Sequence, residues 1–290
     1  METRSVKQLL QIAAMALLCA AAVFILGIRT RWGQKFGDIA LLGRLQSSPE
    51  LRRGALDVLD TLQASSVVVI GGALVLFALI RRRSRLAGVI CVVLFVAIAG
   101  AEFLKRTLVR PDFGIDPQGL TNNWAPSGHT TVAISLIFCA LMVVPRRMRT
   151  VVAVIGALYA AAIASGTLAA GWHRPTDAVM ATFWSFAIAT VGVALLIAWR
   201  GPGTNELAYA DRQHPRFRRA GFALAVGLPL FALGASFAIG HDPVVWTQPS
   251  SRFIAASIVI DLTAVTSVLV FSKLLEGISL DQPHDAAASR

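Results

Sequence analysis

Residues 151–172 read VVAVIGALYAAAIASGTLAAGW and contain no Asp, Glu, Lys or Arg. A helix that crosses a membrane needs about 20 consecutive, mainly apolar residues, so this stretch is long enough to form one. Uncharged runs of this kind recur at 8–28, 62–80, 86–101, 178–199 and 220–240; a shorter one lies at 130–144, and 253–274 is interrupted by Asp261 and Lys273. The pattern predicts an all-α, polytopic membrane helix bundle of about eight spans.

The composition of the chain excludes an ordinary soluble domain. Of its 290 residues, 56% are hydrophobic and 15% are charged, whereas soluble proteins carry about 25% charged residues. The net charge of +11 is compatible with nucleic-acid binding, but the basic residues gather between the apolar runs, as in RRRSR (81–85) and PRRMR (145–149). Such segments mark the cytoplasmic side of a membrane. We therefore predict that both termini are cytoplasmic. We also predict that the partner of the basic residues is the bilayer rather than nucleic acid.

The apolar runs divide the chain into four regions. Residues 1–60 form a first span and an extracytoplasmic loop, and 61–200 contain the spans that carry the polar motifs. We expect residues 201–275 to form a cytoplasmic linker and two C-terminal spans, and 276–290 to form a disordered cytoplasmic tail. Within the loop, the spacing of apolar residues in DIALLGRL and ELRRGALDVLDTLQ predicts short interfacial helices.

Three polar segments stand out from the apolar pattern. They are EFLKRTLVRPDFG (102–114), NWAPSGHT (123–130) and GWHRPTD (171–177). With the predicted topology, all three lie at the extracytoplasmic ends of their spans. Because neighbouring spans pack as a tight bundle, we expect the three segments to meet there.

The segment GWHRPTD combines a histidine, an arginine and an aspartate around a proline. Proline is favoured in the first turn of a helix, so we predict that a span begins near Pro175 with Asp177 in its first turn. Asp177 then lies close enough to accept a hydrogen bond from one ring nitrogen of His173, which makes the other nitrogen a usable nucleophile or base. The alternative is a helix cap with a surface histidine.

The segment APSGHT places Ser127, Gly128 and His129 where the next span begins. Unpaired backbone N–H groups at a helix N-terminus can bind an anion, and His129 beside them can donate a proton. The alternative is an ordinary N-cap with Ser127 as the capping residue.

The third segment, KRTLVRP, supplies Lys105, Arg106 and Arg110. Alone it could be a solvated basic helix end, with Glu102 paired to Lys105 on one helix face. Together with the two histidine segments, its cations predict a phosphate site, because guanidinium and ammonium groups neutralise phosphoryl oxygens. No Asp/Glu cluster of the kind that holds Mg²⁺ lies nearby, so we predict neither a metal nor another cofactor.

In this order, the segments resemble those of the type 2 phosphatidic acid phosphatase (PAP2) superfamily, whose motifs are Lys-x6-Arg-Pro, Pro-Ser-Gly-His and Ser-Arg-x5-His-x3-Asp. The second motif matches at Pro126–His129, and the His-x3-Asp half of the third matches at His173 and Asp177. The resemblance covers roughly residues 65–200. In the first motif, Lys105 and Arg110 stand two residues too close, and in the third Thr167 occupies the arginine position.

The resemblance implies a six-helix core and a phosphohistidine mechanism. His173 would be the nucleophile, Asp177 its orienting partner and His129 the acid for the leaving group. Lys105, Arg110, Ser127 and Gly128 would bind phosphate, with Arg174 replacing the arginine lost at position 167. Substrates would be phosphatidic acid, phosphatidylglycerol phosphate or polyprenyl (di)phosphates, hydrolysed on the extracytoplasmic face of a bacterial plasma membrane. A phosphotransferase on the same scaffold and a non-catalytic lipid-binding protein remain alternatives; no oligomeric state is predicted.

Other polar residues fall outside these motifs. Asp261 lies within an apolar run, where a charge is costly, so we expect either a functional role or a Ser or Thr partner on a neighbouring span. Trp124 and Trp172 flank the two motif histidines and are candidates for the lipid entrance. We assign no role to the remaining histidines, His214, His241 and His284.

Overall fold

The computed structural model describes residues 2–115, 124–200, 248–276 and 278. All of its regular elements are helices: α1 (Glu2–Ile28), α2 (Arg31–Gly43), the 3₁₀ helix η1 (Arg44–Gln46), α3 (Pro49–Asp60), α4 (Ala64–Ile80), α5 (Ser84–Thr107), α6 (Gly128–Val143), α7 (Arg146–Ala169), α8 (Pro175–Arg200) and α11 (Pro249–Leu274). The predicted span 220–240, most of the linker and most of the tail lie outside the described residues.

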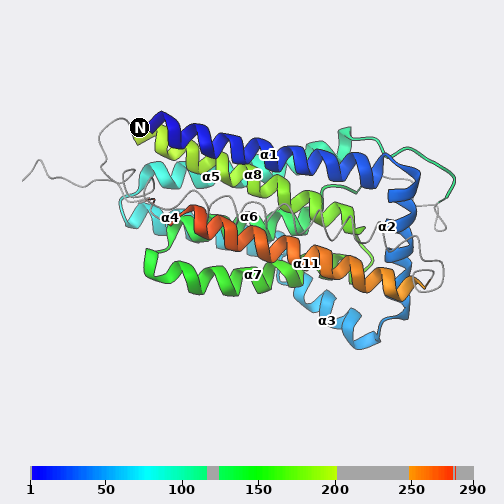
Figure 1. Ribbon diagram of the computed structural model, residues 1–290. Helices are drawn as coiled ribbons and strands as arrows, with labels where there is room; N and C mark the ends of the chain where they lie inside the picture. The colour runs from blue at the N-terminus through cyan, green and yellow to red at the C-terminus, as the bar shows by residue number, and fades with distance from the viewer. Residues whose placement is uncertain (1, 116–123, 201–247, 277, 279–290) are drawn as a thin grey trace, which may run out of the picture.

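The long helices lie side by side, with the N-terminus at the left end of the bundle in Figure 1 and α2 and α3 at the right end. α2 runs across that right end, from the end of α1 to the beginning of α11, and packs against both. α3 packs against α7. The loop predicted at 29–60 is therefore helical, and one of its helices covers an end of the bundle.

Five of the described helices, α1, α5, α7, α8 and α11, are long and apolar enough to cross a membrane. α3 and α4 satisfy the same test as one pair bent by 51°, and α6 is a shorter apolar helix. Each predicted span within the described residues coincides with a helix. The chain is an integral membrane protein with the predicted all-α, polytopic bundle.

Small residues allow the helices of the bundle to approach closely. A Cβ atom on Gly192 of α8 would lie 2.4 Å from Val93 of α5, and one on Gly100 of α5 would lie 2.5 Å from Trp184 of α8. α1 packs against α8, and buried residues of α1 from Leu9 to Ile28 share one apolar core with those of α8 from Ala178 to Ile197. Such contacts replace the hydrophobic driving force, which is absent between helices in lipid.

Aromatic side chains join α11 to the middle of the bundle. The rings of Phe138 (α6), Phe186 (α8) and Phe271 (α11) contact one another. The ring centroid of Phe138 lies 5.9 Å from that of Phe186 and 4.4 Å from that of Phe271, and the last two are 6.1 Å apart. Phe138 and Phe271 have no exposed surface. α11 therefore belongs to the same core as α6 and α8.

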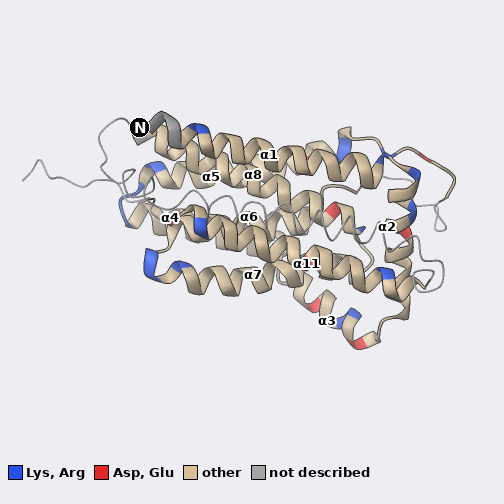
Figure 2. Cartoon of the chain, in the orientation of Figure 1, with Lys and Arg blue, Asp and Glu red and all other residues tan. Residues whose placement is uncertain are grey.

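The arginine-rich segments RRRSR (81–85) and PRRMR (145–149), which indicate the topology, also stabilise the fold. Figure 2 shows Lys and Arg gathered at the left end of the bundle, where α4 meets α5 and α7 begins. Arg83, from RRRSR, donates to the carbonyl of Val143 at the end of α6 (3.1 Å), and Arg149, from PRRMR, donates to the carbonyl of Leu275 after α11 (2.7 Å). Both satisfy carbonyls that a helix end leaves unpaired.

Candidate active site

The turn between α7 and α8 sets the position of His173. Gly171 has φ +81°, a left-handed conformation that favours glycine and ends α7. The N–H groups of Trp172 and His173 both donate to the carbonyl of Thr167, at 2.9 and 3.2 Å. α8 begins at Pro175, as predicted. His173 is thus held in a tight turn at the right end of the bundle.

His173 and Asp177 form the predicted pair. Nδ1 of His173 lies 3.3 Å from Oδ2 of Asp177, and both residues are buried. The carboxylate also accepts the backbone N–H of Arg174 at Oδ2 (3.1 Å) and the hydroxyl of Thr176 at Oδ1 (3.3 Å). Because Asp177 faces Nδ1, the tautomer protonated there leaves the lone pair of Nε2 for chemistry.

The beginning of α6 is joined to the same turn. The backbone N–H of Ser127 donates to the carbonyl of Asp177 (3.0 Å), and the Ser127 side chain caps α6 by accepting from the N–H of Thr130. A Cβ atom on Gly128 would lie 3.8 Å from Nζ of Lys105. The N-cap, which the sequence offered as the alternative to an anion site, is therefore present, and the ammonium group of Lys105 lies beside the helix N-terminus.

The two histidines lie in one site, and each packs against the tryptophan of the other histidine's segment. His129 is half-buried and interacts electrostatically with His173 and Lys105. Trp172 packs against His129 with ring centroids 5.1 Å apart, and Trp124 packs edge-on against His173 at 6.2 Å. Each tryptophan thus contacts the histidine of the other segment, and both remain partly exposed.

Lys105 and Arg106 share a carboxylate at the end of α5. Nζ of Lys105 lies 3.3 Å from Oε2 of Glu102, and Nε of Arg106 lies 2.9 Å from Oε1 of the same residue. The Lys105 side chain is 28% exposed and that of Arg106 is 77% exposed. Lys105 therefore faces the site, whereas Arg106 lies at its outside.

Arg110 and Arg174 are both bound to Asp38 of α2. Nη2 of Arg110 donates to both oxygens of Asp38 (3.1 and 3.0 Å), and Nε of Arg174 donates to Oδ1. The three side chains are 4% exposed. Burial lowers the pKa of Arg110 below its usual value and the charge of Arg174 lowers it further, while Asp38 and Asp177 act in the opposite direction.

Sequence reasoning did not identify Asp38. It lies in the segment 29–60, outside the motifs and about 70 residues before the first arginine that it binds. Its only signal in the sequence is a carboxylate in a stretch with helical spacing. Gln34 lies one turn earlier on the same face of α2. Its amide donates to the carbonyls of Ile28 (2.7 Å) and Pro111 (2.8 Å) and so holds α2 against the site.

Position 167, where the PAP2 motif has an arginine, is occupied by a buried threonine. The Thr167 hydroxyl donates to the carbonyl of Ala164 (2.8 Å), and its own carbonyl accepts from the turn that carries His173. The position is therefore close to the site through its backbone, but its side chain carries no charge; that Arg174 replaces the missing arginine stays a prediction.

The structure brings together every residue selected from the sequence: Lys105, Arg110, Ser127, Gly128, His129, His173, Arg174 and Asp177. Within the described ranges, no three His, Cys, Asp or Glu side chains lie close enough to hold a metal ion. That the reaction needs no metal stays a prediction. Asp261 lies away from this site, in the middle of α11, with the hydroxyl of Ser165 on α7 beside its carboxyl group.

The fold and the site define a helical membrane protein whose charged and imidazole groups converge at one end of the bundle. The family model of the PAP2 superfamily matches residues 86–200, which supports assigning this segment to that superfamily. The matched segment corresponds to α5–α8, so α1–α4 and α11 lie outside it. Comparisons with curated proteins and with solved structures gave no match.

Proposed function

We propose that the protein is a membrane lipid phosphate phosphatase that works through a phosphohistidine intermediate without a metal ion. The observation that carries the proposal is the buried His173–Asp177 pair, placed beside a second histidine, a lysine and two arginines. The superfamily supports a phosphatase-type activity. The charge pattern supports an extracytoplasmic site, since the arginine-rich segments 81–85 and 145–149 lie at the opposite end of the bundle.

In the first step, Nε2 of His173 attacks phosphorus, and the bond between phosphorus and the leaving oxygen breaks. His129, as an imidazolium, gives its proton to that oxygen, so the alcohol leaves neutral. Asp177 keeps Nδ1 of His173 protonated and stabilises the positive charge that develops on the ring. The products of this step are the lipid alcohol and a phosphohistidine.

In the second step, water attacks phosphorus as His129 takes up its proton. The bond between oxygen and phosphorus forms, the bond between nitrogen and phosphorus breaks, and inorganic phosphate leaves. Lys105, Arg110 and Arg174 neutralise the phosphoryl oxygens in both steps, and the N-terminus of α6 at Ser127 and Gly128 faces the same charge. Asp38 acts through the arginines, because one carboxylate fixes the orientation of both guanidinium groups.

Phosphate release from purified protein in lipid nanodiscs tests this function. We would compare phosphatidic acid, phosphatidylglycerol phosphate and a polyprenyl diphosphate, with and without EDTA, using wild type, His173→Ala and Arg53→Ala. Arg53 is a matched control because its side chain is 73% exposed on α3. We expect release by wild type and Arg53→Ala in EDTA, and none by His173→Ala. Unchanged activity of His173→Ala would overturn the mechanism, and phosphoryl transfer to a second alcohol without phosphate release would identify a transferase.

A further inference from the structure

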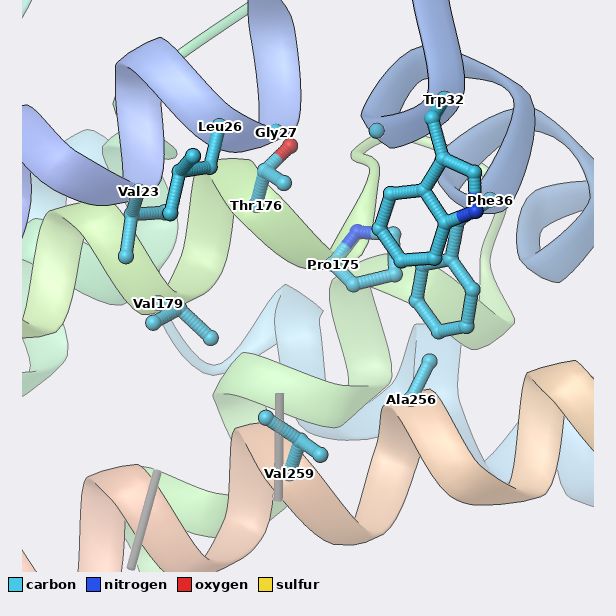
Figure 3. Close-up of a pocket in the computed structure, with 11 residues that line it drawn as sticks. Val23, Leu26, Gly27, Trp32, Phe36, Pro175, Thr176, Val179, Ala256 and Val259 are labelled. Atoms are coloured by element: carbon cyan, nitrogen blue, oxygen red, sulfur yellow. The ribbon is translucent and has the colours of Figure 1, made fainter. Parts of the chain in front are cut away.

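An apolar pocket lies between α1, α2, α8 and α11, next to the candidate active site (Figure 3). Most of its lining side chains are aliphatic or aromatic: Val23, Leu26, Trp32, Phe36, Val179 and Val259. Of the four helices, only α8 belongs to the segment that matches the superfamily. The pocket is thus a feature that this chain builds largely from its additional helices.

Among the described residues that line the pocket, Thr176 alone carries a hydroxyl, and this hydroxyl is hydrogen-bonded to Asp177. Oγ1 of Thr176 donates to Oδ1 of Asp177, while Cγ2 of Thr176 faces Gly27 on α1. On the other side, the rings of Trp32 and Phe36 stack with centroids 6.0 Å apart and lie beside Pro175 (Figure 3). A ligand in the pocket therefore meets hydrocarbon on nearly all sides, which suits a chain without polar atoms.

Two chain segments connect the pocket to the charged residues. On α8, Pro175 and Thr176 line the pocket and directly follow Arg174. On α2, Phe36 lines the pocket and lies two residues before Asp38, which binds Arg174. A molecule with an anionic head and an apolar chain can therefore place the head at the arginines and the chain among these side chains.

We propose that this pocket binds the hydrocarbon chain of the lipid phosphate, in the part nearest to the headgroup, and so selects long-chain substrates. That the headgroup is a phosphate rests on the proposed function. A lipid chain is the occupant that the surroundings favour, because three of the four helices are long enough to span the membrane and Leu26 and Trp32 at the rim are exposed. Anchoring a chain there would hold the phosphate against His173.

Filling the pocket provides the first test. Val259 is 5% exposed and lines the pocket, whereas its neighbour Ile258 is 52% exposed on the outer face of α11. We would compare Val259→Phe with Ile258→Phe on long-chain phosphatidic acid and on a water-soluble short-chain phosphatidic acid. We expect Val259→Phe to lower kcat/KM for the long-chain lipid about tenfold and to leave the short-chain value within about twofold. Equal losses on both substrates, or none, would overturn the proposal.

Trp32→Ala is a second variant in case Phe at position 259 prevents folding. It removes part of the pocket wall from a side chain that is 38% exposed, so the core is left intact. We expect a raised KM for the long-chain lipid alone, with a normal elution profile and melting temperature. An unchanged KM in a folded Trp32→Ala protein would count against a chain in this pocket.

Photolabelling tests the pocket independently of catalysis. The probe is a long-chain phosphatidic acid with a diazirine near the head of one chain, bound to wild type, Val259→Phe and Ile258→Phe and mapped by mass spectrometry. We expect labels on pocket residues of α1 and α11 that are lost in Val259→Phe alone and reduced by unlabelled lipid. Such labelling without phosphate release would support the pocket and refute the phosphatase. Phosphate release with labels spread over the outer helix faces would support the phosphatase and refute the pocket.

Discussion

Asp38 and Arg174 lie 136 positions apart in the sequence, yet the Asp38 carboxylate accepts a hydrogen bond from Nε of Arg174, and both residues are buried. The same carboxylate binds Arg110 from a third segment. A helix outside the superfamily segment therefore completes the charged site of that segment. Two guanidinium groups buried side by side repel each other, and a shared carboxylate is what makes their arrangement stable.

Replacing Asp38 should loosen both arginines. We expect Asp38→Ala to lower the free energy of unfolding by about 3 kcal/mol, because removing one partner leaves buried charge uncompensated. KM for the lipid phosphate should rise more than kcat falls, since the arginines bind phosphate in the ground state as well as in the transition state. Asp38→Asn, which keeps the shape and one acceptor, should show a smaller effect. Melting curves measure the loss of stability, and steady-state kinetics measure the changes in KM and kcat.

Glu50→Gln is the control for this pair, because Glu50 is 73% exposed and bonded only to Arg53 within its own helix in the part of the chain that the structure describes. It should behave as wild type. If Asp38→Ala instead lowered KM, Asp38 would be competing with phosphate for the arginines rather than holding them in place.

The two histidines should differ in the step that they affect. His173→Ala should abolish formation of a phosphoenzyme, whereas His129→Ala should still form one slowly, with a loss of about 10²–10⁴-fold that reflects the missing general acid. An activated phosphate ester, whose leaving group needs no proton, should recover most of the first step in His129→Ala. Rapid quenching followed by mass spectrometry of the 171–177 peptide detects the phosphohistidine. A phosphoryl group found on His129 would reverse the assignment.

Asp177→Asn should lower kcat without a comparable change in KM. The amide keeps the size of the side chain but cannot stabilise a positive ring on His173, so we expect a loss of about 10³-fold or more in kcat. Thr176→Val, which removes the hydrogen bond to the carboxylate but keeps the Cγ2 methyl group, should cost about tenfold or less. Equal losses in the two variants would show that packing around α8, rather than charge, is what matters.

The features predicted correctly from the sequence are those that depend on near neighbours. The start of α8 at Pro175 and the His173–Asp177 bond lie within one helical turn, and the cap at Ser127 needs only the residues that follow it. The convergence of the three motif segments follows from the topology of the spans. These relationships are determined by helix periodicity and capping, which a single sequence displays.

The features that were missed depend on contacts between distant segments. The pattern of α2 indicated a helix, but it did not indicate that the helix crosses the end of the bundle or that Asp38 is directed at two arginines. In the same way, the proximity of Trp172 to His173 in sequence does not reveal that its ring packs against His129. No local rule encodes these contacts, because they depend on how the helices are placed against one another.

The contact between Gly27 and Thr176 links the packing of α1 to the active site. A Cβ atom on Gly27 would lie 2.2 Å from Cγ2 of Thr176, closer than real atoms approach, so Gly27→Ala must displace α1 or the first turn of α8. We expect a loss of about 1–3 kcal/mol in stability and a fall in kcat, because Asp177 lies in the displaced turn. Thermal unfolding and phosphate release measure the two effects.

A second substitution separates this steric effect from a general intolerance of α1. Thr176→Ser removes Cγ2 and keeps the hydroxyl that binds Asp177; the next contact, to Cβ of residue 176 at 3.2 Å, needs a shift of only a few tenths of an ångström. The double variant Gly27→Ala with Thr176→Ser should therefore recover most of the stability and activity. Gly72→Ala is the matched control, since its added Cβ would meet no other part of the described chain within 4 Å beyond its own helix backbone and chain neighbours. Failure of the serine to rescue would mean that Gly27 acts through some contact other than the methyl group of Thr176.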